Sequence, residues 1–202
     1  MIMIVGAQHD DILYFETVMS NKKQEIVLDK YTLTIGTIFN QSVLLVHDVK
    51  TNYLSSALTL YLIEKYFIIL ILVVGRCVAY NQDINPSEIA ISKHAIAGDV
   101  DQVNEDNVKM AQIPGFPQVF DCNDDVIGYL VNAFEKRTLS SLKIANYVST
   151  NTDYHSYNQI KQIREFDHII GFESNVVFDS NTAGIAMVAQ LRKVPFVAVK
   201  VV

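Results

Sequence analysis

The sequence predicts an α/β protein, a single-domain three-layer α/β/α sandwich around a mixed central sheet. Apolar runs typical of strands alternate with segments that carry apolar residues every three or four positions, as amphipathic helices do. Of the 202 residues, 50% are hydrophobic and 19% are charged, which excludes a disordered chain and indicates a large buried core. One domain spanning residues 1–202 accommodates such a core.

The expected strands are rich in isoleucine, valine, leucine and tyrosine, and helical periods lie between several of them. The strands are expected at residues 2–7, 31–38, 42–47, 67–74, 88–92, 142–148 and 195–202. The helices are expected at residues 11–20, 54–66, 124–136, 157–166 and 182–192.

Two segments depart from the alternation of strands and helices. Residues 24–47 hold three strand candidates joined by short turns at Asp29-Lys30 and Asn40-Gln41, so we expect an antiparallel meander and therefore a mixed sheet. Residues 99–121 have few periodic apolar positions and two prolines, which predicts a long loop with a functional or interfacial role.

Charge and composition exclude several kinds of partner. The net charge is -6 and no cluster of lysine and arginine is present, so nucleic acid is not an expected partner. The most apolar run, residues 66–74, is well short of the roughly 20 residues that span a bilayer, so no membrane contact is expected. The N-terminus has no secretion signal, and Cys77 and Cys122 have no metal-ligand spacing. We therefore expect a cytoplasmic protein without metal or cofactor.

Three motifs resemble one enzyme family. They are Met1-Ile-Met-Ile-Val-Gly-Ala-Gln-His-Asp-Asp11, Gly98-Asp-Val-Asp101 and Gln112-Ile-Pro-Gly-Phe-Pro117. They are similar to I-I-G-A-M-E-E-E, Y-H-D-x-D and G-Q-I-P-G-x-P of the 5′-methylthioadenosine/S-adenosylhomocysteine nucleosidases, within the purine nucleoside phosphorylase superfamily. The resemblance extends along nearly all of the chain. It implies a nucleoside phosphorylase-like fold, a purine nucleoside substrate, a role in purine and methionine salvage, and a homodimer that buries residues 54–66 and 112–117.

The first motif carries the expected catalytic residue. Cleavage of a purine N-glycosidic bond needs an acid for the leaving base, a hold on the ribose hydroxyls, and a carboxylate that activates water. The family uses the last Glu of G-A-M-E-E-E as this carboxylate, and counting from Gly6 places Asp11 there. The alternative is that Asp10 and Asp11 only open a helix, where carboxylates cap free amides.

A second expected part of the site follows the strand at residues 67–74. The family's T-G-x-A-G-G-L turn, next to the ribosyl group, aligns with Val74-Gly-Arg-Cys-Val-Ala-Tyr80, so the resemblance assigns Gly75 and Arg76 to substrate binding. The Arg76 guanidinium could bind a small anionic ligand or pair with Asp99 or Asp101, and an exposed surface arginine is the alternative.

The ribose clamp V-E-M-E of the family aligns its last three residues with Asp179, Ser180 and Asn181, which the resemblance assigns to substrate binding. Asn181 can still donate and accept hydrogen bonds, but it lacks the negative charge that favours a cationic sugar. The alternative is a capping role, since asparagine before a helical run is a preferred N-cap and Asp179 or Ser180 could act likewise.

The base pocket of the family, S-G-D-x-F-I, aligns with Ser149-Thr-Asn-Thr-Asp-Tyr154. Direct counting places Asp153 where the family stacks an aromatic ring on adenine, and a shift of one residue brings Tyr154 there. The resemblance therefore assigns both residues to substrate binding, with a tyrosine packed at the surface as the alternative.

The family continues V-P-F-V-x-V-R with an S-D whose Asp protonates the purine, whereas this sequence reads Val194-Pro-Phe-Val-Ala-Val-Lys-Val-Val202 and stops. We expect the last helix and the acid to be missing. A general acid contributes roughly 10²- to 10⁴-fold in rate, so hydrolysis is expected to be weak or lost. The alternative is a non-catalytic descendant that keeps the fold and the dimer as a binding or scaffolding protein.

Overall fold

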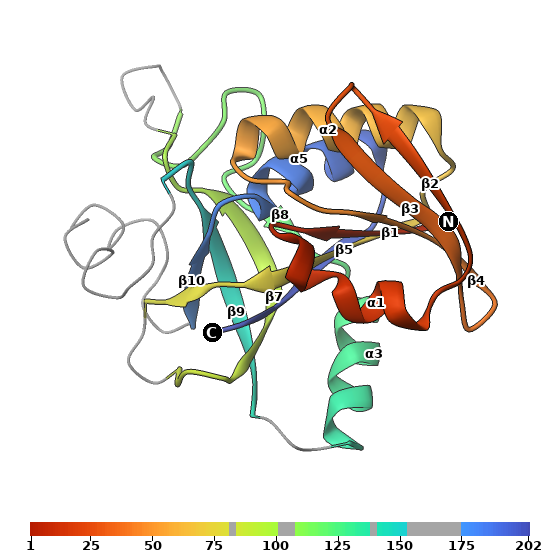
Figure 1. Ribbon diagram of the computed structural model, residues 1–202. Coiled ribbons are helices and arrows are strands. Elements are labelled where there is room, and N and C mark those ends of the chain that lie inside the picture. The colour runs from red at the N-terminus through yellow and green to blue at the C-terminus, as the bar shows by residue number, and fades with distance from the viewer. Residues whose placement is uncertain (81–83, 101–107, 138–140, 153–174) are drawn as a thin grey trace.

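A computed structural model describes residues 1–80, 84–100, 108–137, 141–152 and 175–202 (Figure 1). Within these residues, eleven strands form one sheet in the order β2-β3-β4-β1-β5-β11-β7-β9-β10-β6, with β8 paired to β7. The strands are β1 (Ile2–Gly6), β2 (Ser20–Val27), β3 (Tyr31–Ile38), β4 (Gln41–Val46), β5 (Leu70–Arg76), β6 (Val78–Ala79), β7 (Ile89–Ala97), β8 (Phe120–Asp121), β9 (Leu142–Ser149), β10 (Val176–Asp179) and β11 (Phe196–Val201). The helices are the 3-10 turn η1 (His9–Asp11), α1 (Leu13–Val18), α2 (Asn52–Lys65), α3 (Asp124–Glu135) and α5 (Thr182–Arg192).

The sheet is mixed, as the sequence predicts. Strand β1 lies parallel to β4 and β5, and β5 lies parallel to β11, whereas β11 and β7 are antiparallel. Strands β2, β3 and β4 pair antiparallel in succession, which confirms the predicted meander.

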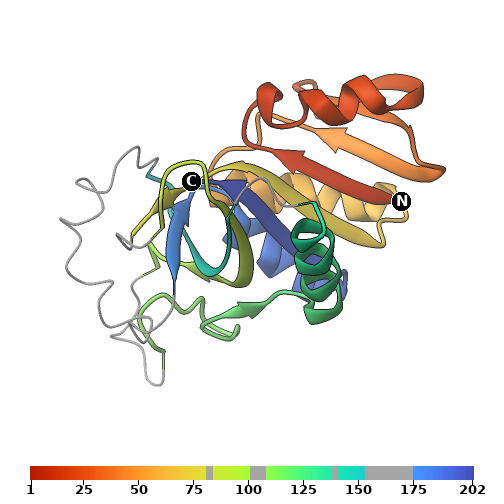
Figure 2. The same cartoon turned by 90° about the horizontal axis from the view of Figure 1, so that it is seen from below.

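Alternation of side chains along the central strands creates the layers. Met3 and Val5 of β1 belong to a buried cluster that includes Leu58 of α2 and Ile185 of α5. The intervening Ile4 belongs to a different cluster. Because successive side chains on a strand point to opposite faces, the sheet is covered on both sides. Figure 1 shows α2 and α5 on one side and α1 on the other, and Figure 2 gives the view from below. The predicted three-layer sandwich is confirmed.

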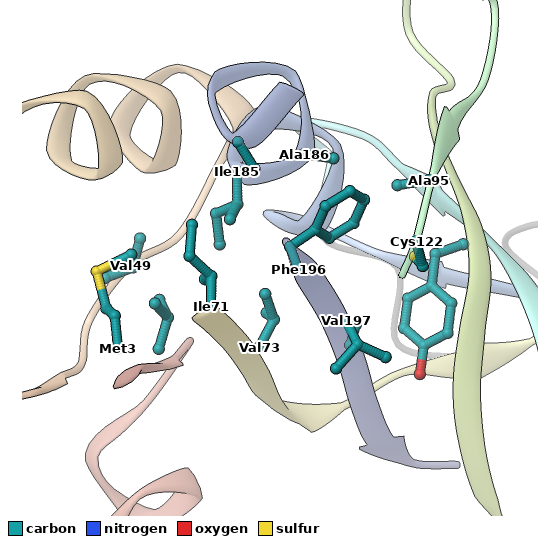
Figure 3. Close-up of a cluster of buried hydrophobic side chains, with 14 of the residues drawn as sticks. Met3, Val49, Ile71, Val73, Ala95, Cys122, Ile185, Ala186, Phe196 and Val197 are labelled. Carbon is teal, nitrogen blue, oxygen red and sulfur yellow. The ribbon is translucent and has the colours of Figure 1, made fainter. Parts of the chain in front are cut away.

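The core between β5, β11 and α5 is drawn in Figure 3. Ile71 of β5 lies beside Phe196 of β11, and Ile185 covers them from α5. The apolar run at residues 66–74 therefore supplies a central strand. No helix within the described residues is long and apolar enough to cross a membrane.

Polar residues fix where two of the helices begin. The Asn123 side chain accepts a hydrogen bond from the backbone N of Val126 at 2.9 Å and caps α3. Thr51 caps α2 by accepting from the backbone N of Leu54, and it does so at φ 66, a conformation that is rare for a β-branched residue. Both helices thus start with a backbone amide satisfied by a side chain.

Several elements differ from their expected bounds. The helix expected at residues 11–20 is shorter, because η1 and α1 share that stretch and β2 already starts at Ser20. Strand β7 continues to Ala97, because a shift of register between Ser92 and His94 lets polar side chains interrupt the apolar run without ending the strand. The helix expected at residues 157–166 lies outside the described residues, as does the middle of the loop at residues 99–121.

Candidate functional site

A pocket of about 360 Å³ opens where β1, β5, β10 and β11 end. Asp11 and Gln8 line it from the turn after β1, and Arg76 lines it from the end of β5. Asp179 and Ser180 contribute from the end of β10. The structure therefore forms this pocket from segments that are far apart in the sequence, and charged side chains are part of its lining.

The Asp11 carboxylate lies against Gly75. A Cβ atom on Gly75 would stand 2.9 Å from Oδ2 of Asp11, and the φ of Gly75 is +142. The same Oδ2 accepts a hydrogen bond from the backbone N of Gln8 at 2.8 Å. Asp11 thus closes the η1 turn and also lines the pocket, so the two roles considered for it are compatible in one geometry.

Arg76 is exposed at the wall of the pocket. Its Nη2 donates to Oε1 of Gln8 at 2.7 Å. Asp99, one of the partners considered for Arg76, accepts instead from the backbone N of Asn151 at 2.8 Å. The other, Asp101, lies outside the described residues. Gln8 therefore links the guanidinium to the turn that carries Asp11.

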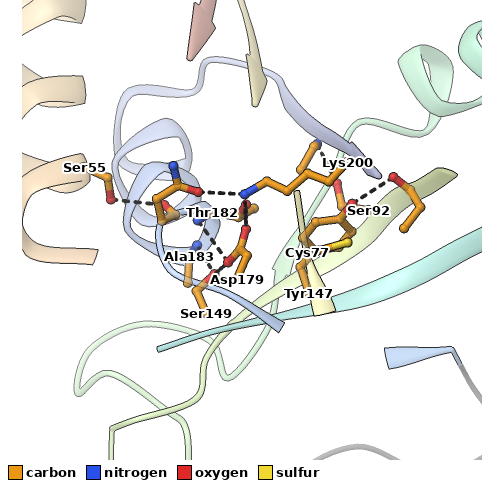
Figure 4. A network of polar contacts seen from close by, with 12 residues as sticks. Ser55, Cys77, Ser92, Tyr147, Ser149, Asp179, Thr182, Ala183 and Lys200 are labelled. Atoms are coloured by element: carbon orange, nitrogen blue, oxygen red, sulfur yellow. Dashed lines mark hydrogen bonds and ion pairs between the residues drawn. The ribbon is translucent and has the colours of Figure 1, made fainter. Parts of the chain in front are cut away.

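A buried ion pair joins β10 to β11 at the wall of the pocket (Figure 4). Nζ of Lys200 lies 2.6 Å from Oδ2 of Asp179, and each side chain is 1% exposed. The Asp179 carboxylate also accepts hydrogen bonds from the hydroxyls of Ser149 and Thr182. Its charge is thereby balanced, and a ligand hydroxyl would have to compete with these three side-chain donors for it.

The Asn181 side chain is held inside the protein. Its Oδ1 accepts from Lys200 Nζ at 2.8 Å, and its Nδ2 donates to the backbone O of Val49 at 2.7 Å. Asn181 occupies the N-cap position of α5, yet its side chain caps no helix amide.

The first amides of α5 are instead satisfied by other side chains. The backbone N of Ala183 donates to the Ser149 hydroxyl at 2.8 Å, and the backbone N of Thr182 donates to Asp179 Oδ1 at 3.4 Å. Asp179 was one of the residues expected as a cap. The start of α5 is therefore occupied by protein groups.

Cys77 also lines the pocket, and burial raises the pKa of its thiol to about 12. At neutral pH it is protonated and a poor nucleophile. Among the described residues, no group of three or more histidine, cysteine or acidic side chains is arranged to hold a metal ion.

Asp153 and Tyr154, the residues expected at the base, lie outside the described residues. Sequence reasoning did not assign Gln8, Lys50 or Lys200 to the site, although all three line the pocket. A signal for Lys200 was present, because a lysine within the otherwise apolar β11 must find a buried partner. Lys50 and Gln8 carry no such signal, since polar residues after a strand are ordinary.

Fold and pocket define a class of protein. The model of the phosphorylase superfamily matches residues 2–202, and the chain belongs to that superfamily. Within it, the chain is similar to 5′-methylthioadenosine/S-adenosylhomocysteine nucleosidases, as the motifs predicted. One such enzyme, from Staphylococcus epidermidis, is 22% identical over 202 residues, which are 100% of this chain and 85% of the relative.

Solved structures of nucleosidases share the fold. The Neisseria meningitidis enzyme in complex with methylthio-immucillin-A superposes with a TM-score of 0.87 at 18% identity, covering 98% of this chain and 83% of that chain. The Colwellia psychrerythraea enzyme in complex with adenine gives a TM-score of 0.86 at 17% identity, and the match covers 99% of this chain and 82% of that chain.

Proposed function

We propose that this protein takes a purine nucleoside into the pocket at Asp11 and hydrolyses its N-glycosidic bond slowly. The observation that carries the proposal is the Asp11 carboxylate, which lines the pocket at the position matching the water-activating carboxylate of the family. Its packing against Gly75 fixes the carboxylate in place. A fixed carboxylate can accept a proton from an attacking water and can stabilise positive charge on the sugar.

Slow turnover follows from the other charges in the pocket. Lys50, Arg76 and Lys200 line it together with Asp11 and Asp179. Lys200 balances Asp179, so among the residues that the structure describes the remaining charges are two cations and one anion. A transition state with a cationic sugar is disfavoured beside unpaired cations, because like charges repel.

The test is adenine release from methylthioadenosine by the purified protein. We expect turnover well below about 1 s⁻¹, the low end of the usual enzyme range, and a loss of at least about 10²-fold for Asp11→Asn if Asp11 activates water. Asp10→Asn is the matched control, because Asp10 is an exposed neighbour in the same turn and does not line the pocket. Equal rates of adenine release by the wild type and Asp11→Asn would contradict the proposal.

A second candidate function is binding without catalysis. The observation that favours it is Asn181, whose amide binds Lys200 and the backbone of Val49 and does not line the pocket. The surplus of cations favours a small anionic ligand, such as phosphate or a carboxylate, in the same pocket. Calorimetric binding of methylthioadenosine or phosphate with no adenine release would support this candidate over hydrolysis.

We also propose a homodimer that buries α2. One face of this helix packs against α5 through Leu58 and Leu62. The opposite face exposes Tyr53 and Leu60, which are 77% and 37% exposed, and Leu54, 41% exposed, lies on the flank of the helix next to Leu58. A helix that is apolar on both faces is typical of a buried position, so a second copy is the expected cover. The cytoplasmic location and the salvage role expected from the sequence stay predictions.

A further inference from the structure

Two loops that border the pocket lie side by side, and each carries a histidine. The first is residues 7–11 after β1, and the second is residues 47–51 after β4. The backbone N of Val49 donates to the backbone O of Gly6 at 3.3 Å and joins them. The rings of His9 and His47 lie 4.7 Å apart between centroids, tilted by 43°. Gln8 and Asp11 reach the pocket from the first loop, and Lys50 reaches it from the second.

Each ring of the His9–His47 pair has its own carboxylate. Nε2 of His9 lies 2.9 Å from Oε2 of Glu16, and Nδ1 of His47 lies 2.9 Å from Oδ2 of Asp48. Oε1 of Glu16 also accepts from the hydroxyl of Thr34, a buried residue of β3, at 3.0 Å. Glu16 is therefore fixed to the sheet, and through it His9 is fixed as well.

His9 and Asp11 belong to the same turn. His9 and Asp11 are the first and last residues of η1, and Gln8 precedes them. The backbone N of Gln8 binds the Asp11 carboxylate, and its side chain binds Arg76. His9 therefore belongs to the same short turn as Asp11, and Gln8 before it and Asp11 after it both line the pocket.

We propose that His9, held between Glu16 and His47, is a positioning residue for the Asp11 turn, and that this hold depends on the protonation of His9. The proposal goes beyond the proposed function, because it concerns the geometry of the pocket whatever ligand the pocket takes.

The sign of the pH dependence follows from the surrounding charges. His9 faces Glu16, Asp10 and Asp48 as well as His47, and the hydrogen bond that the His9 ring donates to Glu16 raises the pKa of His9 above its usual value. Partial burial opposes ionisation of Glu16, but the hydrogen bonds from His9 and Thr34 lower its pKa. Lys22 of β2, which lines a shallow hollow with Glu16, adds a further cation there.

A raised histidine pKa contributes stability that is complete below the unfolded value of about 6.5 and is lost as the pH rises through the folded pKa. A lowered glutamate pKa contributes stability that is lost as the pH falls below about 4.3 through its own folded pKa. The turn is therefore held most firmly in mild acid, between these two limits, and is released toward alkaline pH.

NMR titration tests the proposal without any ligand. The ring signals of His9 and the amide signals of Gln8 and Asp11 are followed from about pH 5 to pH 9, a range that includes the usual histidine pKa of about 6.5 and extends further on its alkaline side. We expect the amides to titrate with the midpoint of His9. In Glu16→Gln, the midpoint should fall toward about 6.5 and the amide titration should shrink. In His9→Gln, the amide titration should disappear.

His94→Gln is the matched control, because His94 pairs with Asp121 at 2.8 Å on β7 and β8 and does not line the pocket. It should leave the Gln8 and Asp11 amides unchanged. The proposal would be overturned if the Gln8 and Asp11 amide signals did not titrate with the midpoint of His9. It would also be overturned if the His9 midpoint were unchanged in Glu16→Gln. Thermal unfolding of each variant separates loss of the fold from loss of the contact. Because no substrate is used, absence of adenine release affects the proposed function and leaves this result intact.

Discussion

The Asp11 carboxylate packs directly on the backbone of Gly75, so closely that a Cβ atom at residue 75 would lie 2.9 Å from one oxygen and 3.1 Å from the carboxyl carbon. The contact joins the turn after β1 to the end of β5, which are neighbours in the sheet with Gly6 paired to Val74. Of the glycine turn expected from the family, Gly75 is the position retained. Its absence of a side chain makes room for the proposed catalytic group.

Replacement of Gly75 by alanine should therefore be destabilising. The φ of +142 is essentially restricted to glycine, and the new methyl group would meet Asp11. We expect a loss of about 1–3 kcal/mol in the free energy of unfolding, measured by urea denaturation. Gly128→Ala is the control, because it is an exposed helical position with open space, where alanine should stabilise by up to about 1 kcal/mol. Equal effects at both positions would contradict the contact.

Removal of one partner from the buried Lys200–Asp179 pair should lower the free energy of unfolding more than Gly75→Ala does. Lys200→Met leaves the Asp179 carboxylate buried without its cation, which typically costs about 3–5 kcal/mol. The double variant Lys200→Met/Asp179→Asn removes both charges, so we expect it to recover part of this loss. Urea denaturation of the two single variants and the double variant gives the coupling energy. Lys23→Met, at an exposed position of β2, should change stability little. A coupling energy near zero would mean that the pair does not stabilise the fold.

The sequence predicted the framework better than the site. The apolar run of β1, its end at Gly6 and the following carboxylates gave the place of Asp11, because this pattern is local. Lys200 and Asp179 are 21 residues apart in sequence, and their pairing depends on how β10 and β11 converge, which no local pattern records. The four residues of β10 were also too few for a period to be recognised. The Gln8 contact with Arg76 likewise exists only after folding.

Both cysteines should react slowly in the folded protein. Burial raises the pKa of Cys77 and of Cys122 to about 12, so very little thiolate is present at pH 8. A disulfide reagent at pH 8 should label them quickly only after denaturation. A raised thiol pKa also means that stability is retained below the unfolded value of about 8.5 and falls as the pH rises toward 12. Rapid labelling of the native protein at pH 8 would contradict the burial of both thiols.

A charge on the exposed face of α2 should separate the proposed dimer. Leu60→Glu places a carboxylate on that face while Leu58 and Leu62 still pack inside, so the fold should persist. We expect sedimentation at micromolar concentration to show a dimer for the wild type and a monomer for Leu60→Glu. Leu191→Glu is the control, because Leu191 is an exposed leucine of α5, on a different helix. A wild-type monomer at this concentration would rule out the dimer.

Loss of the Arg76 charge should raise any hydrolytic turnover while weakening the binding of anions. Arg76 lines the pocket that holds Asp11, so its positive charge opposes a cationic sugar at the transition state. Arg76 is exposed, and solvent screens the repulsion, so we expect adenine release from methylthioadenosine to rise only about two- to fivefold in Arg76→Gln. The affinity for inorganic phosphate, measured by calorimetry, should fall in the same variant.

Arg192→Gln serves as the control for this experiment, because Arg192 pairs with Glu64 at 2.7 Å and does not line the pocket. It should change neither quantity. The two measurements separate the roles considered for Arg76, since repulsion of a cationic sugar and attraction of an anion change in opposite directions when the charge is removed. A lower turnover in Arg76→Gln would instead show that the guanidinium helps to hold the nucleoside, through Gln8 or directly, and that its charge is not what slows the reaction.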